Sequence, residues 1–217
     1  MLTPTELDSY AAAFFTLGRF HREAPDAQTL QAFWELIEDW PIEENDATRK
    51  GLALFEQSRD AQESAHQIDR DHNWLYGVSA TAKVPPFESV HRDREGLLFD
   101  EQTMAVRAVY KQLGLQVTNL NREPDDHVGV ELDFLAQCCL RALDALDAGD
   151  LAGARAYLQL ARTFLDDHVN QWAPQMLNDA AEQADTKFMR GLCLASVGVL
   201  ESFTENTEVL IDDAPSQ

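Results

Sequence analysis

Residues 123–149 read EPDDHVGVELDFLAQCCLRALDALDAG, which is the longest helical pattern in the chain. Pro124 opens the pattern, and Gly149 supplies its stop. Between them apolar residues recur at steps of three and four, at Val128, Leu132, Leu135, Cys139, Ala142 and Leu146. This spacing predicts a long amphipathic helix that buries one face in a core.

The remainder of the chain follows the same rule. Thr3 and Glu6 form a capping-box pattern, with Pro4 at the first helical position. Similar apolar spacing predicts further helices over residues 4–18, 30–37, 45–72, 100–113, 150–165, 175–181 and 188–203. No run alternates long enough to predict a strand, so we expect an all-α, single-domain helical bundle.

The predicted domain covers residues 1–203, and an acidic tail over 204–217 is expected to be frayed. The break at 119–123 lies between two predicted helices and is a plausible hinge for exchange of helices between copies. The sequence leaves open a monomer or a helix-swapped dimer.

One stretch, residues 78–96, has no helical period. The pair Pro85-Pro86 disfavours helix for itself and for the residue before it. Trp74, Leu75 and Tyr76 precede the stretch, and Phe87 lies within it, so it is too apolar for a simple linker. We predict a long, ordered, Pro-containing loop that lies over the helical body.

The composition narrows the class of partner. The 217 residues include 38 Asp plus Glu and 17 Lys plus Arg, for a net charge of −21. Nucleic-acid binding and docking on anionic membranes both need clustered cations, so neither is expected. No apolar stretch approaches the length of a membrane span, and the N-terminus lacks the pattern of a secretory signal. We expect a cytoplasmic protein whose partner carries positive charge.

Glu123, Asp125, Asp126, His127 and Glu131 form the densest polar cluster. Acids in a first helical turn are ordinary helix-start chemistry. His127 and Glu131 also share a helix face, so a binding site, or a metal-dependent hydrolase that uses Asp126, His127 and Glu131, is an alternative. No phosphate loop, nucleophile elbow or metal-binding signature accompanies the cluster. We therefore predict no enzyme and no cofactor; a helical scaffold joining two proteins is a further alternative.

Three short motifs carry a resemblance to a known family. Pro85-Pro86-Phe87-Glu88-Ser89-Val90, followed by Leu97-Leu98-Phe99, resembles the PP-[aromatic]-x-S-V…LLF segment of the TorD/DmsD family. The cluster from Glu123 to Leu135 resembles its E-P-x-D-H…E-L-x-F-L motif, and Phe164-Leu165-x-x-His168 with Trp172-Ala173-Pro174 resembles its F-L-x-x-H…W-x-P stretch. Order and spacing agree from about Leu7 to Phe203.

The resemblance implies a function. Members are all-helical cytoplasmic chaperones that bind the twin-arginine signal peptide and precursor of a molybdopterin-containing oxidoreductase. They hold it until its cofactor is inserted and the enzyme is assembled. Carried over to this chain, the resemblance and the cluster predict a peptide-binding set: Trp74, Leu75, Tyr76, Pro86, Phe87, Glu88, Ser89, Glu123, Asp125, Asp126, His127 and Glu131.

The chemistry of such a peptide fits these residue types. A twin-arginine signal joins two guanidinium groups to an apolar stretch. Carboxylates can bind guanidinium groups in a bidentate geometry, so we expect Glu123, Asp125, Asp126 and Glu131 to receive the arginines. Trp74 and the neighbouring apolar residues would cover the apolar stretch.

Overall fold

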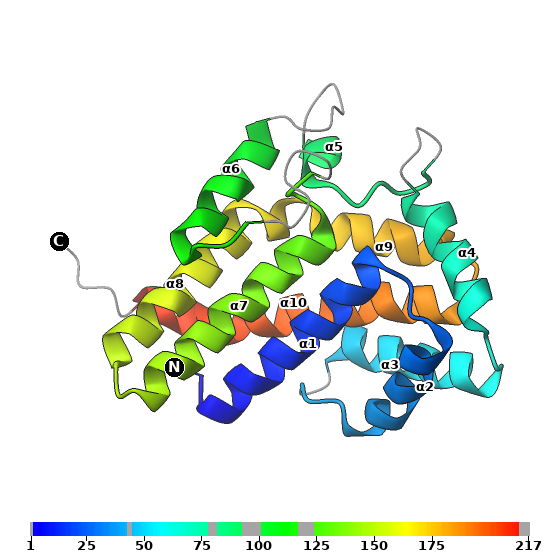
Figure 1. The fold of residues 1–217 in the computed structure, drawn as a ribbon, viewed down its shortest axis with the longest axis horizontal. Helices are drawn as coiled ribbons and strands as arrows, with labels where there is room; N and C mark the ends of the chain where they lie inside the picture. Colours follow the sequence, from blue (N-terminus) through cyan, green and yellow to red (C-terminus); the bar gives the residue numbers. More distant parts are fainter. Residues whose placement is uncertain (1, 43–44, 78–81, 93–100, 117–123, 213–217) are drawn as a thin grey trace.

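The computed structural model describes residues 2–42, 45–77, 82–92, 101–116 and 124–212 (Figure 1). Regular structure in these ranges is helical, which confirms the all-α prediction. The α-helices are α1 Pro4–Arg22, α2 Ala27–Leu36, α3 Asp46–Asp60, α4 Ala65–Tyr76, α5 Glu88–Arg92, α6 Glu101–Tyr110, α7 Val128–Asp147, α8 Leu151–Asp167, α9 Ala173–Gln183 and α10 Lys187–Asp212. Short 3-10 turns follow α2, α6 and α8, namely η1 Ile37–Asp39, η2 Lys111–Leu113 and η3 Val169–Gln171.

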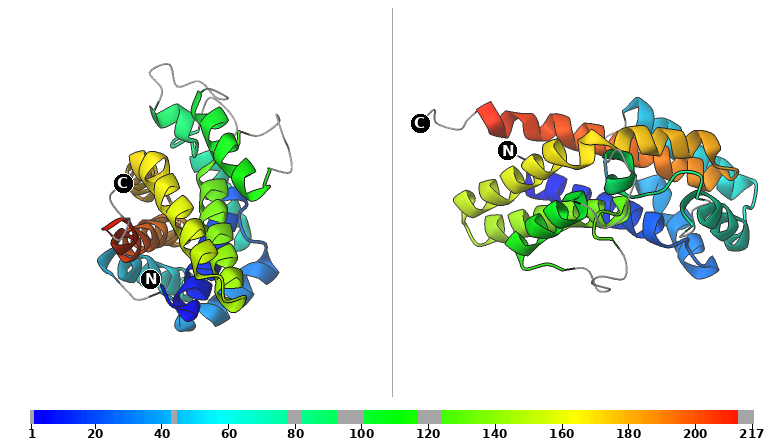
Figure 2. Two further views of the ribbon diagram at one scale, coloured as in Figure 1. Left: turned by 90° about the vertical axis from the view of Figure 1, so that its left-hand side faces the viewer. Right: turned by 90° about the horizontal axis from the view of Figure 1, so that it is seen from above.

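The core forms where the long helices lie against one another. Helix α7 packs between α1 and α8, while α10 contacts α1, α3, α8 and α9. Figure 2 shows α7, α8 and α10 running along the molecule, and Figure 1 shows α1 beside α7. The side chains of Phe14, Leu132, Leu135, Phe188 and Phe203 are almost fully buried in this core. Each lies on the apolar stripe that the helical spacing predicts.

The helix expected over residues 45–72 is instead two helices, so that prediction was wrong in its extent. Helix α3 ends at Asp60, and Gln62 adopts a positive φ of 54°. Ser64 then caps α4 through a capping box with Gln67. Because no Gly or Pro marks the break, the apolar spacing alone reads through it.

The last helix extends beyond the predicted domain end. Helix α10 continues to Asp212, so most of the segment expected as a frayed tail is helical. Thr207 is fully buried, and its hydroxyl donates to the carbonyl oxygen of Phe203 at 2.6 Å. The predicted hinge at 119–123 lies outside the described residues, so the swapped dimer stays a prediction.

None of the described helices is both long enough and apolar enough to cross a membrane.

Two glycines set the distance between α1 and α7. A Cβ atom on Gly18 would lie 2.7 Å from the carbonyl oxygen of Gly129, and a Cβ on Gly129 would collide with the Gly18 carbonyl oxygen. The two backbones therefore touch at this crossing, close to the N-terminal end of α7. This contact fixes where the polar cluster before α7 lies relative to α1.

We expect Gly18→Ala to lower the free energy of unfolding by about 1–3 kcal/mol, because the new methyl group meets backbone that cannot move aside. Urea unfolding measures this, with Asp8→Ala on the exposed face of α1 as the control. Alanine favours helix over glycine by about 1 kcal/mol, so without the collision the substitution would stabilise the protein. A Gly18→Ala variant as stable as the parent would show that the crossing is not tight.

Candidate functional site

A short backbone pairing joins the Pro-containing segment to the start of α7. The N–H of Glu88 donates to the carbonyl oxygen of Asp126 at 2.9 Å, and the N–H of Val128 donates to that of Pro86, also at 2.9 Å. The two bonds make an isolated antiparallel bridge between Phe87 and His127. Proline fixes φ in the extended range and has no N–H, so Pro86 offers only its carbonyl to such a pairing.

The Asp126 carboxylate ties three helices together. One oxygen accepts from the Ser89 N–H at 2.7 Å, and the other accepts from the Thr103 hydroxyl at 2.8 Å. All three side chains are fully buried. Since these partners lie in α5 and α6, one buried carboxylate at the entrance of α7 positions both helices.

Asp125 makes a second link to α6. Its carboxylate pairs with the guanidinium of Arg107, whose Nε lies 3.0 Å from Oδ2. The hydroxyl of Tyr110 donates to the Asp125 carbonyl oxygen at 3.1 Å. A buried charge is tolerated when it is paired and hydrogen-bonded. Oδ2 of Asp125 meets that condition, while its buried Oδ1 has no hydrogen-bond partner among the described residues.

Two glutamates lie deeper, against the end of α8. Glu88 is fully buried, accepts from Nδ1 of His168 at 3.0 Å and pairs with Arg92. Glu131 is also fully buried, and its Oε2 accepts from the indole N–H of Trp172 at 3.1 Å. Burial, together with the nearby Glu88 and Asp126 carboxylates, holds the pKa of Glu131 well above its usual range. Glu131 therefore keeps its proton to a higher pH than an exposed glutamate does.

Neutral histidines lie below the same surface. His21 is fully buried and its two ring nitrogens contact the hydroxyl groups of Tyr76 at 3.1 Å and Ser196 at 2.9 Å. Burial lowers the pKa of His21 and His72, and it lowers the pKa of His127 to about 3. At neutral pH these imidazoles add no positive charge that would repel a cationic partner.

The predicted peptide-binding residues fall into three groups. Trp74 is 51% exposed, while Phe87 and His127 are half-buried and their rings lie 5.2 Å apart. Glu123 lies outside the described residues. The buried members are Leu75, Tyr76, Pro86, Glu88, Ser89, Asp125, Asp126 and Glu131.

The contacts of Asp126, His127 and Glu131 do not favour the alternative of a metal site. Asp126 bonds Ser89 and Thr103, and Glu131 bonds Trp172. His127 Nδ1 accepts from the N–H of Gly129 at 3.0 Å. Within the described part of the chain no three such side chains gather in a way that could hold a metal ion.

Sequence reasoning missed the partners from α6. Thr103 and Arg107 carry no motif, and only the three-dimensional packing brings them to Asp126 and Asp125. The stretch from His168 to Trp172 did carry a signal, because it forms the third family motif. Its residues bond Glu88 and Glu131, so two separated motifs meet in one polar network.

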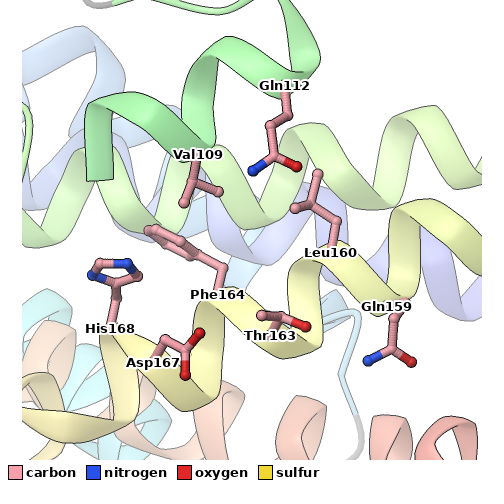
Figure 3. A pocket seen from close by; sticks show the side chains of 8 residues that line it. All are labelled: Val109, Gln112, Gln159, Leu160, Thr163, Phe164, Asp167 and His168. Carbon is pink, nitrogen blue, oxygen red and sulfur yellow. The ribbon is translucent and has the colours of Figure 1, made fainter. Parts of the chain in front are cut away.

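A small cavity borders this network (Figure 3). It has a volume of about 240 Å³, lies between α6–η2 and α8, and reaches His168. Its lining consists of Val109, Gln112, Gln159, Leu160, Thr163, Phe164, Asp167 and His168. Pockets for cofactors usually measure about 300–1,000 Å³, so this one suits a side chain better than a cofactor.

Comparison with known proteins places the chain. The family model described as nitrate reductase delta subunit matches residues 23–178. The chaperone protein TorD of Vibrio vulnificus is 26% identical over 151 residues, which cover 68% of this chain and 69% of that protein. TorD of Photobacterium profundum is 25% identical over 165 residues, covering 76% of this chain and 70% of the relative. The probable Tat proofreading chaperone DmsD of Haemophilus influenzae is 24% identical over 168 residues, covering 77% and 73% respectively.

The fold and these comparisons thus place the chain among all-helical chaperones of the TorD/DmsD type. The chain belongs to the nitrate reductase delta subunit family, the family of TorD, which confirms the resemblance seen in its motifs. The relatives are named as chaperones and not as enzymes, in agreement with the prediction that this chain is not an enzyme.

Removing the Asp126 carboxylate should loosen the whole site. We expect Asp126→Ala to lower the free energy of unfolding by about 3–5 kcal/mol, because it leaves the Ser89 N–H and the Thr103 hydroxyl buried without an acceptor. Thr103→Val, which deletes one of the two bonds at constant shape, should cost about 1–2 kcal/mol. Urea unfolding of both variants measures the difference, and equal losses would contradict the role given to Asp126.

Glu131 gives a pH-dependent prediction. Above its ordinary pKa of 4.5 the unfolded chain releases this proton while the folded chain retains it, so the native state loses stability as pH rises. Glu131→Gln removes that loss. We expect the stability of the variant relative to the parent to increase by about 1–3 kcal/mol between pH 5 and pH 7.

Urea unfolding at the two pH values measures this, with Glu182→Gln on the exposed face of α9 as a control for loss of a surface carboxylate. A stability difference between Glu131→Gln and the parent that does not change with pH would contradict a raised pKa for Glu131.

Proposed function

We propose that this chain is a cytoplasmic chaperone that binds the twin-arginine signal peptide of a molybdenum-containing oxidoreductase precursor. It would retain the precursor while the cofactor is inserted and the enzyme assembled, before export. Membership of a family of chaperones supports the general role. The peptide and the client class rest on the motif resemblance and on the surface beside the bridged segment.

The observation that carries the proposal is the bridge between Phe87 and His127. It holds two family motifs, far apart in the sequence, against each other, and both residues of the bridge are half-buried. Trp74, at the end of α4, is also exposed, and the chain that returns from it leads into the bridged segment through Val84. These are the aromatic side chains that the proposal assigns to the apolar stretch of a signal peptide.

The buried residues have a different part in the proposal. Asp125, Asp126 and Glu88 hold the segment in place through Arg107, Ser89, Thr103 and His168, so they shape the surface without forming it. Direct contact of Asp125, Asp126 or Glu131 with an arginine of the peptide requires that these internal bonds open. Such contact stays a prediction, as does contact with Glu123.

Charge favours the encounter. The net charge of −21 attracts a cationic peptide over the whole surface, and the neutral histidines within and beneath the site do not oppose it. Binding should weaken with salt because of this attraction, and it should show a negative heat-capacity change because apolar surface is buried.

Calorimetry tests the proposal. Synthetic signal peptides from the molybdoenzymes of the same genome are titrated into the parent, Phe87→Ala and Leu151→Ala. We expect at least one peptide to bind the parent and Phe87→Ala to weaken its Kd about tenfold, since a central aromatic anchor commonly contributes more than about 1 kcal/mol.

Leu151 is 59% exposed at the start of α8 and serves as the matched control for loss of an exposed apolar side chain. We expect Leu151→Ala to bind as the parent does. Absence of binding to every peptide would overturn the proposed function, and equal weakening by both variants would overturn the location of the site.

A further inference from the structure

The described carboxylates of the site are buried and each has at least one partner inside the protein, so a guanidinium group arriving from outside needs another partner at the surface. Trp74 offers one. It lies in the last turn of α4, between the buried face formed by Leu75 and Tyr76 and the returning chain. The residue is 51% exposed, so part of its indole is accessible to a partner.

The ring of Trp74 already holds a cation. The ammonium nitrogen of Lys83 lies 4.8 Å from the ring centroid, within the distance at which a cation is attracted to the face of an indole. Indole is the best of the aromatic side chains for this interaction. One face of this indole therefore already contacts a cation of the protein itself.

Two backbone hydrogen bonds hold Lys83 at this position. The N–H of Lys83 donates to the carbonyl oxygen of Trp74 at 3.4 Å, and that of Val84 donates to the carbonyl oxygen of Leu75 at 3.0 Å. These bonds bring the chain back along the end of α4. Among the described residues no carboxylate lies within ion-pair distance of the Lys83 ammonium. Within the same part of the chain, the Trp74 ring is therefore the one group that stabilises this charge.

We propose that Lys83 occupies, in the free protein, the place on the Trp74 ring that an arginine of the bound peptide takes. On binding, the arginine stacks on Trp74 and Lys83 moves into solvent, so one cation replaces another on the same ring. This inference rests on the proposed function and assigns to Trp74 the recognition of a guanidinium group.

The exchange favours arginine for a physical reason. A guanidinium group is planar and weakly hydrated, and it stacks on aromatic faces, whereas an ammonium group is compact and strongly hydrated. Lys83 is exposed, so it can return to water without leaving a buried charge behind. Lys83 thus lowers the apparent affinity for every peptide that uses the ring, and an arginine displaces it more readily than a lysine does.

A double-mutant cycle tests the exchange. The signal peptide that binds the parent is titrated by calorimetry into Lys83→Met, Trp74→Leu and the double variant, at an ionic strength of about 0.15 M to screen distant charges. We expect Lys83→Met to lower the Kd by about two- to fivefold, the range expected for an exposed cation–π contact. Trp74→Leu should raise the Kd, and adding Lys83→Met to it should change nothing further.

Lys50→Met, on the exposed surface of α3, controls for the loss of one positive charge and should leave the Kd unchanged. A peptide with both arginines changed to lysine should bind the parent more weakly than the arginine peptide does, and Trp74→Leu should narrow that difference. Circular dichroism checks that each variant folds.

The outcomes separate the two claims. If no peptide binds the parent, the proposed function fails and this inference fails with it. If the peptide binds the parent but Lys83→Met leaves its Kd unchanged or raises it, the inference alone is overturned. A gain that persists in the Trp74→Leu background would also overturn it, because the ring would then play no part.

Discussion

The pairing of residues 86–88 with residues 126–128 is the constraint on which this end of the molecule depends. Two backbone hydrogen bonds join the segments, and the buried Asp126 carboxylate adds two more bonds to α5 and α6. A buried carboxylate without partners would be strongly unfavourable, so these contacts stabilise one another. The cluster therefore acts as one unit that closes the Pro-containing segment onto α7.

The acidic residues of the chain have two separate roles. The 38 acidic residues together give the chain its net charge of −21. The acids of the site differ, because Glu88, Asp125, Asp126 and Glu131 point inward and are bound by Arg92, Arg107, Ser89 or Trp172. In the proposed account the general charge attracts a cationic peptide, the inward acids fix the surface, and aromatic rings make the contact.

The helices and the family could be predicted from the sequence, because apolar spacing and short motifs are local signals. The break at Gln62 could not, since a positive φ at a polar residue leaves no local mark. The inward direction of Asp125 and Asp126 also escaped prediction. Both precede α7, where helical periodicity does not yet assign a face, and their partners Arg107 and Thr103 come from a different helix. The residues at the end of α4 also differ from the prediction, which placed Trp74, Leu75 and Tyr76 together against the peptide. Helical geometry turns successive side chains by about 100°, so Leu75 and Tyr76 are buried while Trp74 is half-exposed.

Hydrogen exchange of three backbone amides tests the central claim most directly. The N–H groups of Glu88, Ser89 and Val128 bond Asp126 and Pro86 across the two segments. If the segments form one closed unit, these amides exchange slowly in the peptide-free protein, and Asp126→Ala makes all three exchange fast while the amides in the middle of α7 stay protected. Fast exchange of these three amides in the unmodified protein would contradict the account.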